Sequence, residues 1–469
     1  MAAPLTVLIM AAGQGTRMRS GVPKVLHRVA GKMLVEWVVD TARAAGAARV
    51  VVIVRPGDGV AEGLPDGVEV AEQRQGEGTG AAVLAARDAV LGGGAATAGG
   101  APGTVVVMSG DHPLITVEQL EGLIGEHESR AAVATLLTTD RLDPAGYGRV
   151  ARDPSGAVER VFETKYPQDR TPEELAVREI NLGTYAFDAE ALFSALDDVE
   201  LERGERYLIG VLPVFRAAGQ VVAAHMTDDA EAAIGINDRI GLMRAEEVAQ
   251  RRIVEAHARA GVTFLHPGTT RVEAGVTIGS DSVIGPCTVL LGGTTIGERC
   301  ELGPNTTLRD ATVADGAAVV HSFVVEATIG PGAKVGPFAY LRPGTRVRAN
   351  AKVGTFVEVK NSDIGEGAKV PHLSYIGDAE VGENSNLGAS TITANYDGRH
   401  KHRTKLGKSV KTSVHTSLVA PLEIGDRAYT GAGSAITEDV PEGALAIARQ
   451  RQKNIDGYAD RKEQEDSQK

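Results

Sequence analysis

Cysteine is nearly absent from this sequence, and the two present, Cys287 and Cys300, favour reduced thiols over a disulfide framework. No apolar run approaches the roughly 18 residues that a membrane-spanning helix needs. Basic residues do not predominate, because the formal net charge is -12, which argues against a general nucleic-acid binder but leaves room for local phosphate pockets. The start of the chain lacks a basic stretch before its apolar run and predicts a first strand rather than a signal peptide. We therefore expect a cytoplasmic protein with neither membrane nor nucleic acid as partner.

Aromatic residues are also few, at 4%, whereas glycine is frequent with 57 residues, which favours tight turns and narrow, regular packing. The length of 469 residues exceeds one ordinary core and predicts two or three domains. The expected division is a first domain at 1–237, a linking helix at 238–260, a repeat domain at 261–450 and a charged, disordered tail at 451–469.

The first domain alternates short apolar runs with helical stretches, a pattern typical of a parallel sheet covered by helices on both faces. Strands are expected at 5–10, 49–54, 104–108 and 131–137, and helices at 35–45, 79–91 and 117–128. Ligands of such sheets bind at the carboxyl ends of the strands. The segments MAAGQG (10–15) and SGD (109–111) both fall at such ends.

The 238–260 segment reads as one long helix that begins at Asp238 as N-cap and ends before Gly261. Beyond it, aliphatic residues recur every six positions, often followed by a glycine that would permit a bend. The repeat comprises Val272, Ile278, Ile284, Leu290, Ile296 and Leu302, then Ile329, Val335, Leu341, Val347 and Val353, then Ile364, Val370 and Ile376, and finally Ile424, Thr430 and Ile436. This hexapeptide period predicts a β-helix rather than a mixed β domain with incidental glycines. The interruptions near 311–328 and 392–423 are expected to be loops that leave the coil.

The loop MAAGQGTRM (10–18) follows the first expected strand, and its small residues let backbone N–H groups approach an anion. Arg17 and, after Pro23, Lys24 add charges that can bind phosphates. A purely structural turn is the alternative for a lone glycine-rich loop. The spacing excludes both the dinucleotide GxGxxG and the GxxxxGK[ST] patterns.

Asp111 ends an expected strand, and a carboxylate there can hold Mg²⁺ against a triphosphate, although a plain strand-end aspartate is the alternative. Asn237 could complete the metal site or simply cap the linking helix. Gly78 and Thr79 open an expected helix and suit contact with a base or phosphate.

These segments occur in a particular order, and the order resembles one family over nearly the whole chain. The motifs are the opening loop, Gln73 with Gly78-Thr79, Gly110-Asp111, GYGRV (146–150), VFETK (161–165), INLG (180–183) and GINDR (235–239). This set is similar to that of the bifunctional N-acetylglucosamine-1-phosphate uridylyltransferases and glucosamine-1-phosphate N-acetyltransferases. The resemblance implies an α/β nucleotidyltransferase domain (Rossmann-like, with a mostly parallel sheet) and a left-handed parallel β-helix of hexapeptide repeats.

The resemblance also implies roles for residues of the first half. The nucleotide UTP would be bound by Met10, Ala11, Ala12, Gly13, Arg17, Lys24, Gln73, Gly78 and Thr79. The amino sugar would be bound by Gly148, Glu163, Asn181 and Asn237, and Mg²⁺ by Asp111 and Asn237.

In the second half, His372 lies between the repeat positions Val370 and Ile376. A hexapeptide-repeat acyltransferase needs a general base, and a neutral imidazole suits that work. The alternatives are a corner histidine with a backbone hydrogen bond, or a zinc ligand as in carbonic anhydrases of this shape, with His321, His400 and His402 as the other candidates. No close repeat-spaced histidine pair surrounds His372.

The resemblance assigns the remaining positions of the second half. His372 would be the catalytic base, and the sugar phosphate would be held by Arg342, Lys360, Tyr375 and Asn386. Acetyl-CoA would contact Ala389, Asn395, Tyr396, Ala432 and Arg449. Two departures from the family pattern stand out: Ser413-Val414-His415 replaces a G-S-D segment, and Thr355 replaces an asparagine.

The family reading implies synthesis of UDP-N-acetylglucosamine for cell-wall precursors, by acetylation of glucosamine-1-phosphate followed by uridylyl transfer from UTP. It also implies a homotrimer with acetyltransferase sites between subunits. Two other hypotheses are a pyrophosphorylase with a regulatory β-helix and a non-enzymatic scaffold. The first usually lacks an H-x-x-Y sequence, which is present at 372–375, and the second should have lost Arg17, Lys24 or Asp111, all of which are present.

Overall fold

The computed structural model describes residues 4–92, 103–162, 164, 168 and 170–467, and it divides into two units, Met1–Arg252 and Ile253–Lys469. The boundary falls inside the long helix α7 (Arg239–Arg259). At its start the Asp238 carboxylate accepts a hydrogen bond from the Gly241 N–H at 2.8 Å, which is the expected N-cap. At its end Gly261 has φ of 96° and the Val262 N–H donates to the His257 carbonyl at 3.1 Å, as in a Schellman motif.

The first unit is built on a mixed sheet with the strand order β11-β7-β10-β6-β1-β4-β5. Its strands are β1 (Thr6–Met10), β4 (Arg49–Val54), β5 (Glu69–Glu72), β6 (Thr104–Ser109), β7 (Ala134–Thr139), β8 (Arg149–Arg152), β9 (Val158–Phe162), β10 (Ile180–Asp188) and β11 (Val222–Met226), with a small hairpin of β2 (Arg28–Val29) and β3 (Lys32–Met33). Strand β10 runs antiparallel to both β6 and β7, whereas the pairs of β1 with β4 and β6 are parallel. The sheet is therefore mostly parallel near the opening loop, as expected.

Helices cover both faces of this sheet because its central strands are apolar on both sides. They are α1 (Leu34–Ala44), α2 (Thr79–Leu84), α3 (Val117–Ser129), α4 (Pro172–Ala176), α5 (Ala189–Asp198) and α6 (Val211–Ala217). Val7 and Ile9 of β1 pack with residues of α1 and α3, whereas Leu8 packs with α2, α5 and α6. The alternation of side chains along β1 thus separates two cores.

Two predicted elements of this unit differ from the structure. The helix expected at 79–91 ends as α2 at Leu84 and continues as a π-helical segment, η4 (Asp88–Gly92), where Arg87 donates to the Phe193 carbonyl of α5 at 2.6 Å. The strand expected at 131–137 is β7, which begins at Ala134 because Ala131, at φ of 47°, ends the preceding helix. A tertiary contact accompanies the first difference and a left-handed backbone conformation the second, and the sequence pattern locates neither.

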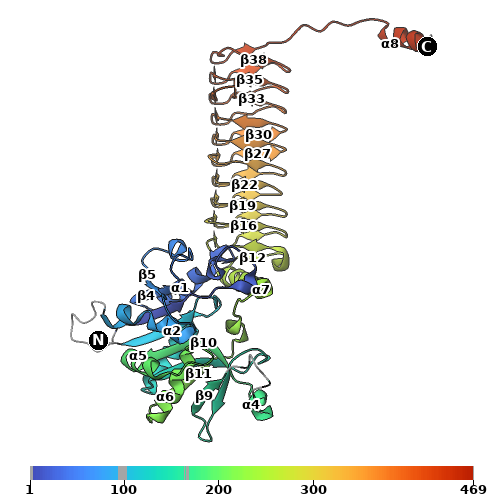
Figure 1. The fold of residues 1–469 in the computed structure, drawn as a ribbon. Coiled ribbons are helices and arrows are strands. Elements are labelled where there is room, and N and C mark those ends of the chain that lie inside the picture. Colours follow the sequence, from blue (N-terminus) through green and yellow to red (C-terminus); the bar gives the residue numbers. More distant parts are fainter. Residues whose placement is uncertain (1–3, 93–102, 163, 165–167, 169, 468–469) are drawn as a thin grey trace. The chain divides into compact units, whose positions relative to one another are not determined.

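The second unit is a parallel β-helix with three sheets, and Figure 1 shows its coils stacked along one axis. The first sheet contains β12 (Thr263–Phe264), β15 (Val283–Ile284), β18 (Glu301–Leu302), β21 (Ala318–Val319), β24 (Lys334–Val335), β27 (Lys352–Thr355) and β30 (Lys369–His372). The second contains β13 (Arg271–Val272), β16 (Val289–Leu291), β19 (Thr307–Arg309), β22 (Phe323–Val325), β25 (Tyr340–Leu341), β28 (Glu358–Lys360), β31 (Tyr375–Gly377), β33 (Ile392–Ala394), β35 (Ser417–Val419) and β38 (Ala435–Ile436). The third contains β14 (Thr277–Ile278), β17 (Thr295–Ile296), β20 (Thr312–Val313), β23 (Thr328–Ile329), β26 (Arg346–Val347), β29 (Asp363–Ile364), β32 (Ala379–Val381), β34 (Thr404–Leu406) and β36 (Leu422–Ile424), and the pair β37 (Tyr429–Thr430) and β39 (Leu445–Ala446) follows.

The hexapeptide prediction is confirmed, because every predicted repeat residue from Val272 to Ile436 is buried in or beside a strand. The loops expected at 311–328 and 392–423 are largely wrong, since both regions contain strands of the coil. Around 311–328 the coil continues, but three of its faces are one residue shorter. The six-residue phase is lost because five residues separate Leu308 from Val313, Val319 from Val324, and Val324 from Ile329. Around 392–423 only residues 395–403, between β33 and β34, leave the coil.

Glycines that follow the repeat residues act as expected at Gly303 and Gly336, which adopt φ of 92° and 106°, but others such as Gly279 do not. The left-handed corner positions are often occupied by other residues, such as Asp281 and Cys287, both with positive φ. Gly279 instead lies so close to the next coil that a Cβ would stand 2.6 Å from the carbonyl carbon of Gly297. Glycines such as Gly279 therefore permit close approach of neighbouring coils rather than the bend itself.

Replacing Gly279 with alanine should lower the stability of the β-helix by about 1–3 kcal/mol, because the added methyl meets backbone atoms that cannot move aside cheaply. Urea denaturation followed by circular dichroism would measure the loss. Gly293→Ala is the matched control, since its Cβ would meet only an Asp310 carboxylate oxygen at 3.9 Å. Equal transitions for the two variants would contradict this account of the glycines.

The C-terminal tail, expected to be disordered, contains helix α8 (Tyr458–Ser467), in which no residue is buried. Its composition explains the difference, because it is rich in helix-forming residues and has a Lys462–Glu465 ion pair at 2.8 Å. Among the described residues, no helix is both long and apolar enough to cross a bilayer.

Candidate functional site

The opening loop lies at the carboxyl end of β1 and continues into the 3-10 helix η1 (Thr16–Met18). Gly15 has a φ of 58°, and a Cβ at this position would stand only 2.7 Å from the Lys24 Cβ. A residue with a side chain would therefore be crowded here. The loop is also held from outside, since Arg55 donates to the Ala12 carbonyl at 2.6 Å and to Glu77 at 2.8 Å. Arg55 thus connects the predicted phosphate loop to the segment before Gly78, a role that the sequence analysis missed.

Arg17, Lys24, Asp111 and Asn237 are brought together as predicted. The Asn237 side-chain oxygen accepts hydrogen bonds from Arg17 at 2.9 Å and from the Lys24 ammonium at 3.3 Å. The same ammonium forms an ion pair with Asp111 Oδ2. Three segments far apart in the sequence therefore converge on one point at the carboxyl ends of β1 and β6.

Asp111 is buried, and its second carboxylate oxygen is fixed by its neighbours. Oδ1 accepts hydrogen bonds from the Ser109 hydroxyl at 2.5 Å and lies 2.8 Å from His112 Nδ1. Burial raises the pKa of the Asp111 carboxyl, but His112 and Lys24 beside it lower the pKa by more, so it lies well below the usual value. The carboxylate is therefore charged, with Oδ2 turned toward a cation.

The donor set of this point fits Mg²⁺. Asp111 Oδ2 and Asn237 Oδ1 both contact one ammonium nitrogen, so a single cation can reach both oxygens. Mg²⁺ prefers oxygen ligands and commonly takes only one or two from the protein, with phosphates and waters completing its shell. Among the described residues there is no cluster of three or more His, Cys, Asp or Glu residues that could hold a metal. A site with only one carboxylate and one amide oxygen from the protein is compatible with that finding.

Of the residues predicted to bind the base, Gln73 directly follows β5, and Gly78 and Thr79 lie at the start of α2. Gln73 is buried, and its amide donates to the Gly76 carbonyl at 3.1 Å. A Cβ on Gly78 would stand 2.4 Å from the Arg206 carbonyl oxygen, and the Thr79 hydroxyl accepts a hydrogen bond from the Leu208 N–H at 2.9 Å. Gly78 and Thr79 thus hold the 206–208 segment against α2. This is a structural role in addition to the predicted binding of the nucleotide.

Two of the residues predicted to bind the amino sugar are adjacent. The Asn181 N–H donates to the Gly148 carbonyl at 2.9 Å, and the Asn181 amide contacts the Tyr185 hydroxyl at 2.6 Å. A register shift in β10 between Asn181 and Tyr185 locally separates it from β7. Glu163, the third, lies outside the described residues.

In the second unit, Arg342, Lys360 and Tyr375 lie on or directly after neighbouring strands of the second sheet, β25, β28 and β31. Arg342 donates to Glu358 at 2.8 Å, and Lys360 contacts Asp378 at 3.4 Å. Burial raises the pKa of Asp378, but hydrogen bonds from Asn361 and Asn395 and the Lys360 ammonium outweigh it and lower the pKa.

Lys401, which the sequence analysis missed, reaches the same place from the 395–403 excursion. The nearby Lys360 ammonium lowers the pKa of Lys401, because two like charges disfavour each other. Two neighbouring lysines, with Arg342 also close enough to affect Lys401, form a positive region that suits an anion such as phosphate. The basic run Arg399 to Arg403 was the signal in the sequence, but its position beside Lys360 depends on how the excursion folds back.

His372 is exposed at the end of β30, one corner before Tyr375 in β31. Its register partner in β27 is Thr355, the position where the family motif has asparagine, so that departure lies beside the predicted base. Asn386 is exposed and bridges to Lys369 on the same sheet.

The residues predicted to contact acetyl-CoA do not form one cluster of side-chain contacts. Asn395 is buried with its amide on Asp378, whereas Tyr396 is exposed and donates to the Gly398 carbonyl at 2.8 Å. Ala432 and Arg449 are exposed near the last coils, and the Ala389 carbonyl accepts from the His415 N–H at 2.8 Å. The Ser413-Val414-His415 departure therefore packs directly against the 388–390 turn, since a Cβ on Gly388 would stand 2.5 Å from the Ser413 carbonyl carbon.

Comparisons with known proteins agree with this geometry. Residues 7–211 match the MobA-like NTP transferase domain family, and residues 272–310 match the bacterial transferase hexapeptide (six repeats) family. The chain is 47% identical over 466 residues to the bifunctional protein GlmU of Mycolicibacterium vanbaalenii, covering 97% of this chain and 93% of that protein. It is 46% identical to the bifunctional protein GlmU of Halalkalibacterium halodurans, covering 97% of this chain and 98% of that protein. The bifunctional protein GlmU of Mycobacterium bovis is also 46% identical, over 97% of this chain and 92% of that protein.

Proposed function

The chain belongs to the family of bifunctional GlmU proteins, and from this premise we propose that its two halves make UDP-N-acetylglucosamine in two successive transfers. The β-helix acetylates glucosamine-1-phosphate with acetyl-CoA, and the α/β unit then transfers the uridylyl group of UTP to N-acetylglucosamine-1-phosphate. One observation supports the assignment: each half has its own group of cationic side chains suited to a phosphate, Arg17 with Lys24 in the first and Arg342 with Lys360 in the second.

In the acetyl transfer, Arg342, Lys360 and Lys401 bind the phosphate of glucosamine-1-phosphate, and Tyr375 and Asn386 hold its sugar. His372 accepts a proton from the amine as the nitrogen attacks the thioester carbonyl of acetyl-CoA. A C–N bond forms, the C–S bond breaks, and coenzyme A leaves as its thiol. Ala389, Asn395, Tyr396, Ala432 and Arg449 are proposed contacts of acetyl-CoA.

In the uridylyl transfer, the opening loop with Arg17 and Lys24 binds the triphosphate, and Gln73, Gly78 and Thr79 bind the base. A phosphate oxygen of N-acetylglucosamine-1-phosphate attacks the α-phosphorus, and the bond to the bridging oxygen breaks so that pyrophosphate leaves. Gly148, Asn181 and Glu163 are proposed to hold the amino sugar. Mg²⁺, held by Asp111 and Asn237, would neutralise charge that develops on the phosphates.

We also propose a homotrimer that works in the cytoplasm. Support for association comes from exposed apolar side chains at one corner of the β-helix, where Phe338 and Phe356 stack at 5.2 Å and Leu373 follows beside His372. The two cysteines are both unpaired, as in a reducing compartment. Sedimentation equilibrium should return three times the mass of the chain, and a monomer would contradict the trimer.

The function is tested by supplying the purified chain with glucosamine-1-phosphate, acetyl-CoA, UTP and Mg²⁺. Free thiol should appear first, followed by UDP-N-acetylglucosamine and pyrophosphate in equal amounts, as followed by thiol titration and anion-exchange chromatography. Without acetyl-CoA, neither UDP-N-acetylglucosamine nor pyrophosphate should form unless N-acetylglucosamine-1-phosphate is added. Release of thiol without the UDP-sugar, or formation of the UDP-sugar from N-acetylglucosamine-1-phosphate without any acetyl transfer, would contradict the bifunctional assignment.

A further inference from the structure

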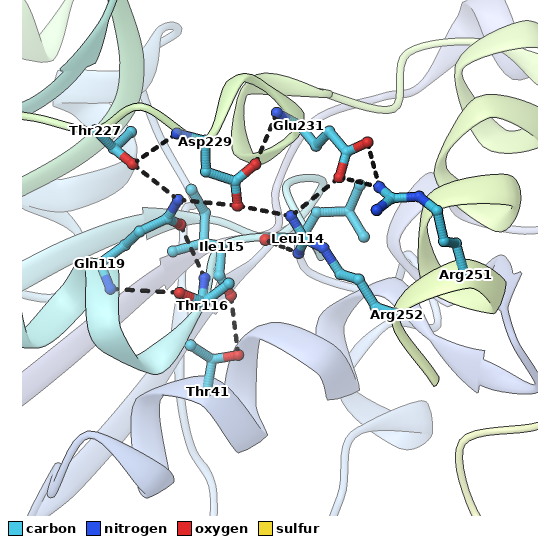
Figure 2. A network of polar contacts seen from close by, with 10 residues as sticks. All are labelled: Thr41, Leu114, Ile115, Thr116, Gln119, Thr227, Asp229, Glu231, Arg251 and Arg252. Atoms are coloured by element: carbon cyan, nitrogen blue, oxygen red, sulfur yellow. Dashed lines mark hydrogen bonds and ion pairs between the residues drawn. The ribbon is translucent and has the colours of Figure 1, made fainter. Parts of the chain in front are cut away.

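Arg252, in helix α7, connects two segments that lead to the proposed metal ligands (Figure 2). One guanidinium nitrogen donates to the Leu114 carbonyl at 2.8 Å, and the other donates to the Asp229 carboxylate at 2.7 Å. Leu114 lies three residues after Asp111, and Asp229 lies eight residues before Asn237. The planar guanidinium therefore holds both approaches to the metal site at once.

The segment after Asp111 is held at several further points, which Figure 2 also shows. The Thr41 hydroxyl donates to the Ile115 carbonyl at 3.3 Å. The Thr116 N–H donates to Gln119 Oε1 at 2.9 Å, which closes a capping box at the start of α3. Arg252 itself holds this segment through its hydrogen bond to the Leu114 carbonyl.

The segment before Asn237 is anchored at Asp229. Its carboxylate accepts hydrogen bonds from Gln119 at 3.3 Å and from the Glu231 N–H at 3.0 Å, so it caps the short helix η8 (Ala230–Ala233). Further along, the Ile236 N–H donates to the Asp111 carbonyl at 3.0 Å. Asp229 therefore anchors the beginning of the segment that runs through η8 to this contact and to Asn237.

We propose that Arg252 is a positioning residue for uridylyl transfer, which sets the separation of the Asp111 and Asn237 oxygens by clamping Leu114 to Asp229. The inference rests on the proposed function, since it assigns a role to the support of that metal site. Removal of a residue that hydrogen-bonds a metal ligand commonly changes metal affinity by about 10- to 100-fold, and Arg252, one contact further from the ligands, is expected at the lower end of that range. Arg252 itself touches neither oxygen, so its loss should alter the site without removing a ligand.

The test uses the full chain with Arg252→Met, which keeps the length of the side chain but neither of its hydrogen bonds. Arg259→Met is the matched control, because Arg259 lies on the same helix and pairs with Glu255 at 3.1 Å on the surface. Binding of Mn²⁺ in the presence of UTP is measured by electron paramagnetic resonance. Uridylyl transfer is measured against Mg²⁺ concentration, and acetyl transfer is measured in the same samples.

We expect Arg252→Met to weaken Mn²⁺ binding by about 10-fold and to raise the Mg²⁺ concentration for half-maximal uridylyl transfer similarly, with acetyl transfer unchanged. Arg259→Met should match the unchanged chain in all three. Unaltered Mn²⁺ affinity in Arg252→Met, even with a lower melting temperature or slower turnover, would overturn the inference and leave only a structural ion pair. If the unchanged chain bound Mn²⁺ no better than Asp111→Asn, the proposed metal site itself would be wrong, which is a separate failure.

Discussion

Replacing His372 with alanine should lower acetyl transfer by about 10²- to 10⁴-fold while uridylyl transfer from N-acetylglucosamine-1-phosphate continues at its usual rate. The loss follows because the amine must give up a proton as it attacks the thioester, and alanine offers no base. Structural damage should be small, since His372 is exposed at a strand end and its carbonyl, not its ring, accepts the hydrogen bond from the Ser374 hydroxyl at 2.7 Å. Thiol release from acetyl-CoA measures the first activity and pyrophosphate release the second.

His266→Asn is a suitable control for this variant, because His266 is also exposed on the β-helix, between β12 and β13, well before the coils that carry the proposed site. It should keep both activities. Retention of acetyl transfer within about threefold in His372→Ala would show that another group takes the proton. Loss of both activities in His372→Ala would show that the two halves are coupled, contrary to a two-site enzyme.

Replacing Asp111 with asparagine should have the opposite effect and lower uridylyl transfer by about 10²- to 10³-fold or more, with acetyl transfer unchanged. The carboxylate is buried and charged, and its Oδ2 is the only one of the two oxygens turned toward Lys24 and Asn237, so the substitution removes the main charge available to a metal ion. Pyrophosphate release at saturating UTP and Mg²⁺ measures the effect.

Asp40→Asn provides the control, because Asp40 forms an exposed ion pair with Lys32 in the same unit and lies on helix α1. It should leave uridylyl transfer within about twofold of the unchanged chain. If Asp111→Asn kept most of its activity, or if a higher Mg²⁺ concentration restored it fully, the assignment of Asp111 as the principal ligand would have to be abandoned.

Much of the site could be predicted because its residues stand in short motifs whose chemistry is local. Arg17 and Lys24 follow a strand within one loop, and Asp111 follows another, so the rule that parallel strands end at one edge placed them together. The contribution of Asn237 was harder to predict, because its side chain contacts Lys24, which lies more than two hundred positions earlier in the sequence. Arg55, Lys401 and Arg252 were missed for the same reason: each is one arginine or lysine among many until the fold gives it partners.

The sequence by itself determined the two-part architecture, because a hexapeptide period and an alternation of strands and helices are set by local geometry and burial. It also determined the family, through motifs in a fixed order. Only the tertiary structure decided that the coil continues through 311–328 with shorter faces, since pairing with the coils on either side, as of Thr312 with Thr295 and Thr328, compensates for the lost residues. It alone decided which oxygen of Asp111 faces the cation and which cations gather beside Asp378. Those contacts join side chains from segments far apart in the chain, and the sequence does not show which distant segments meet.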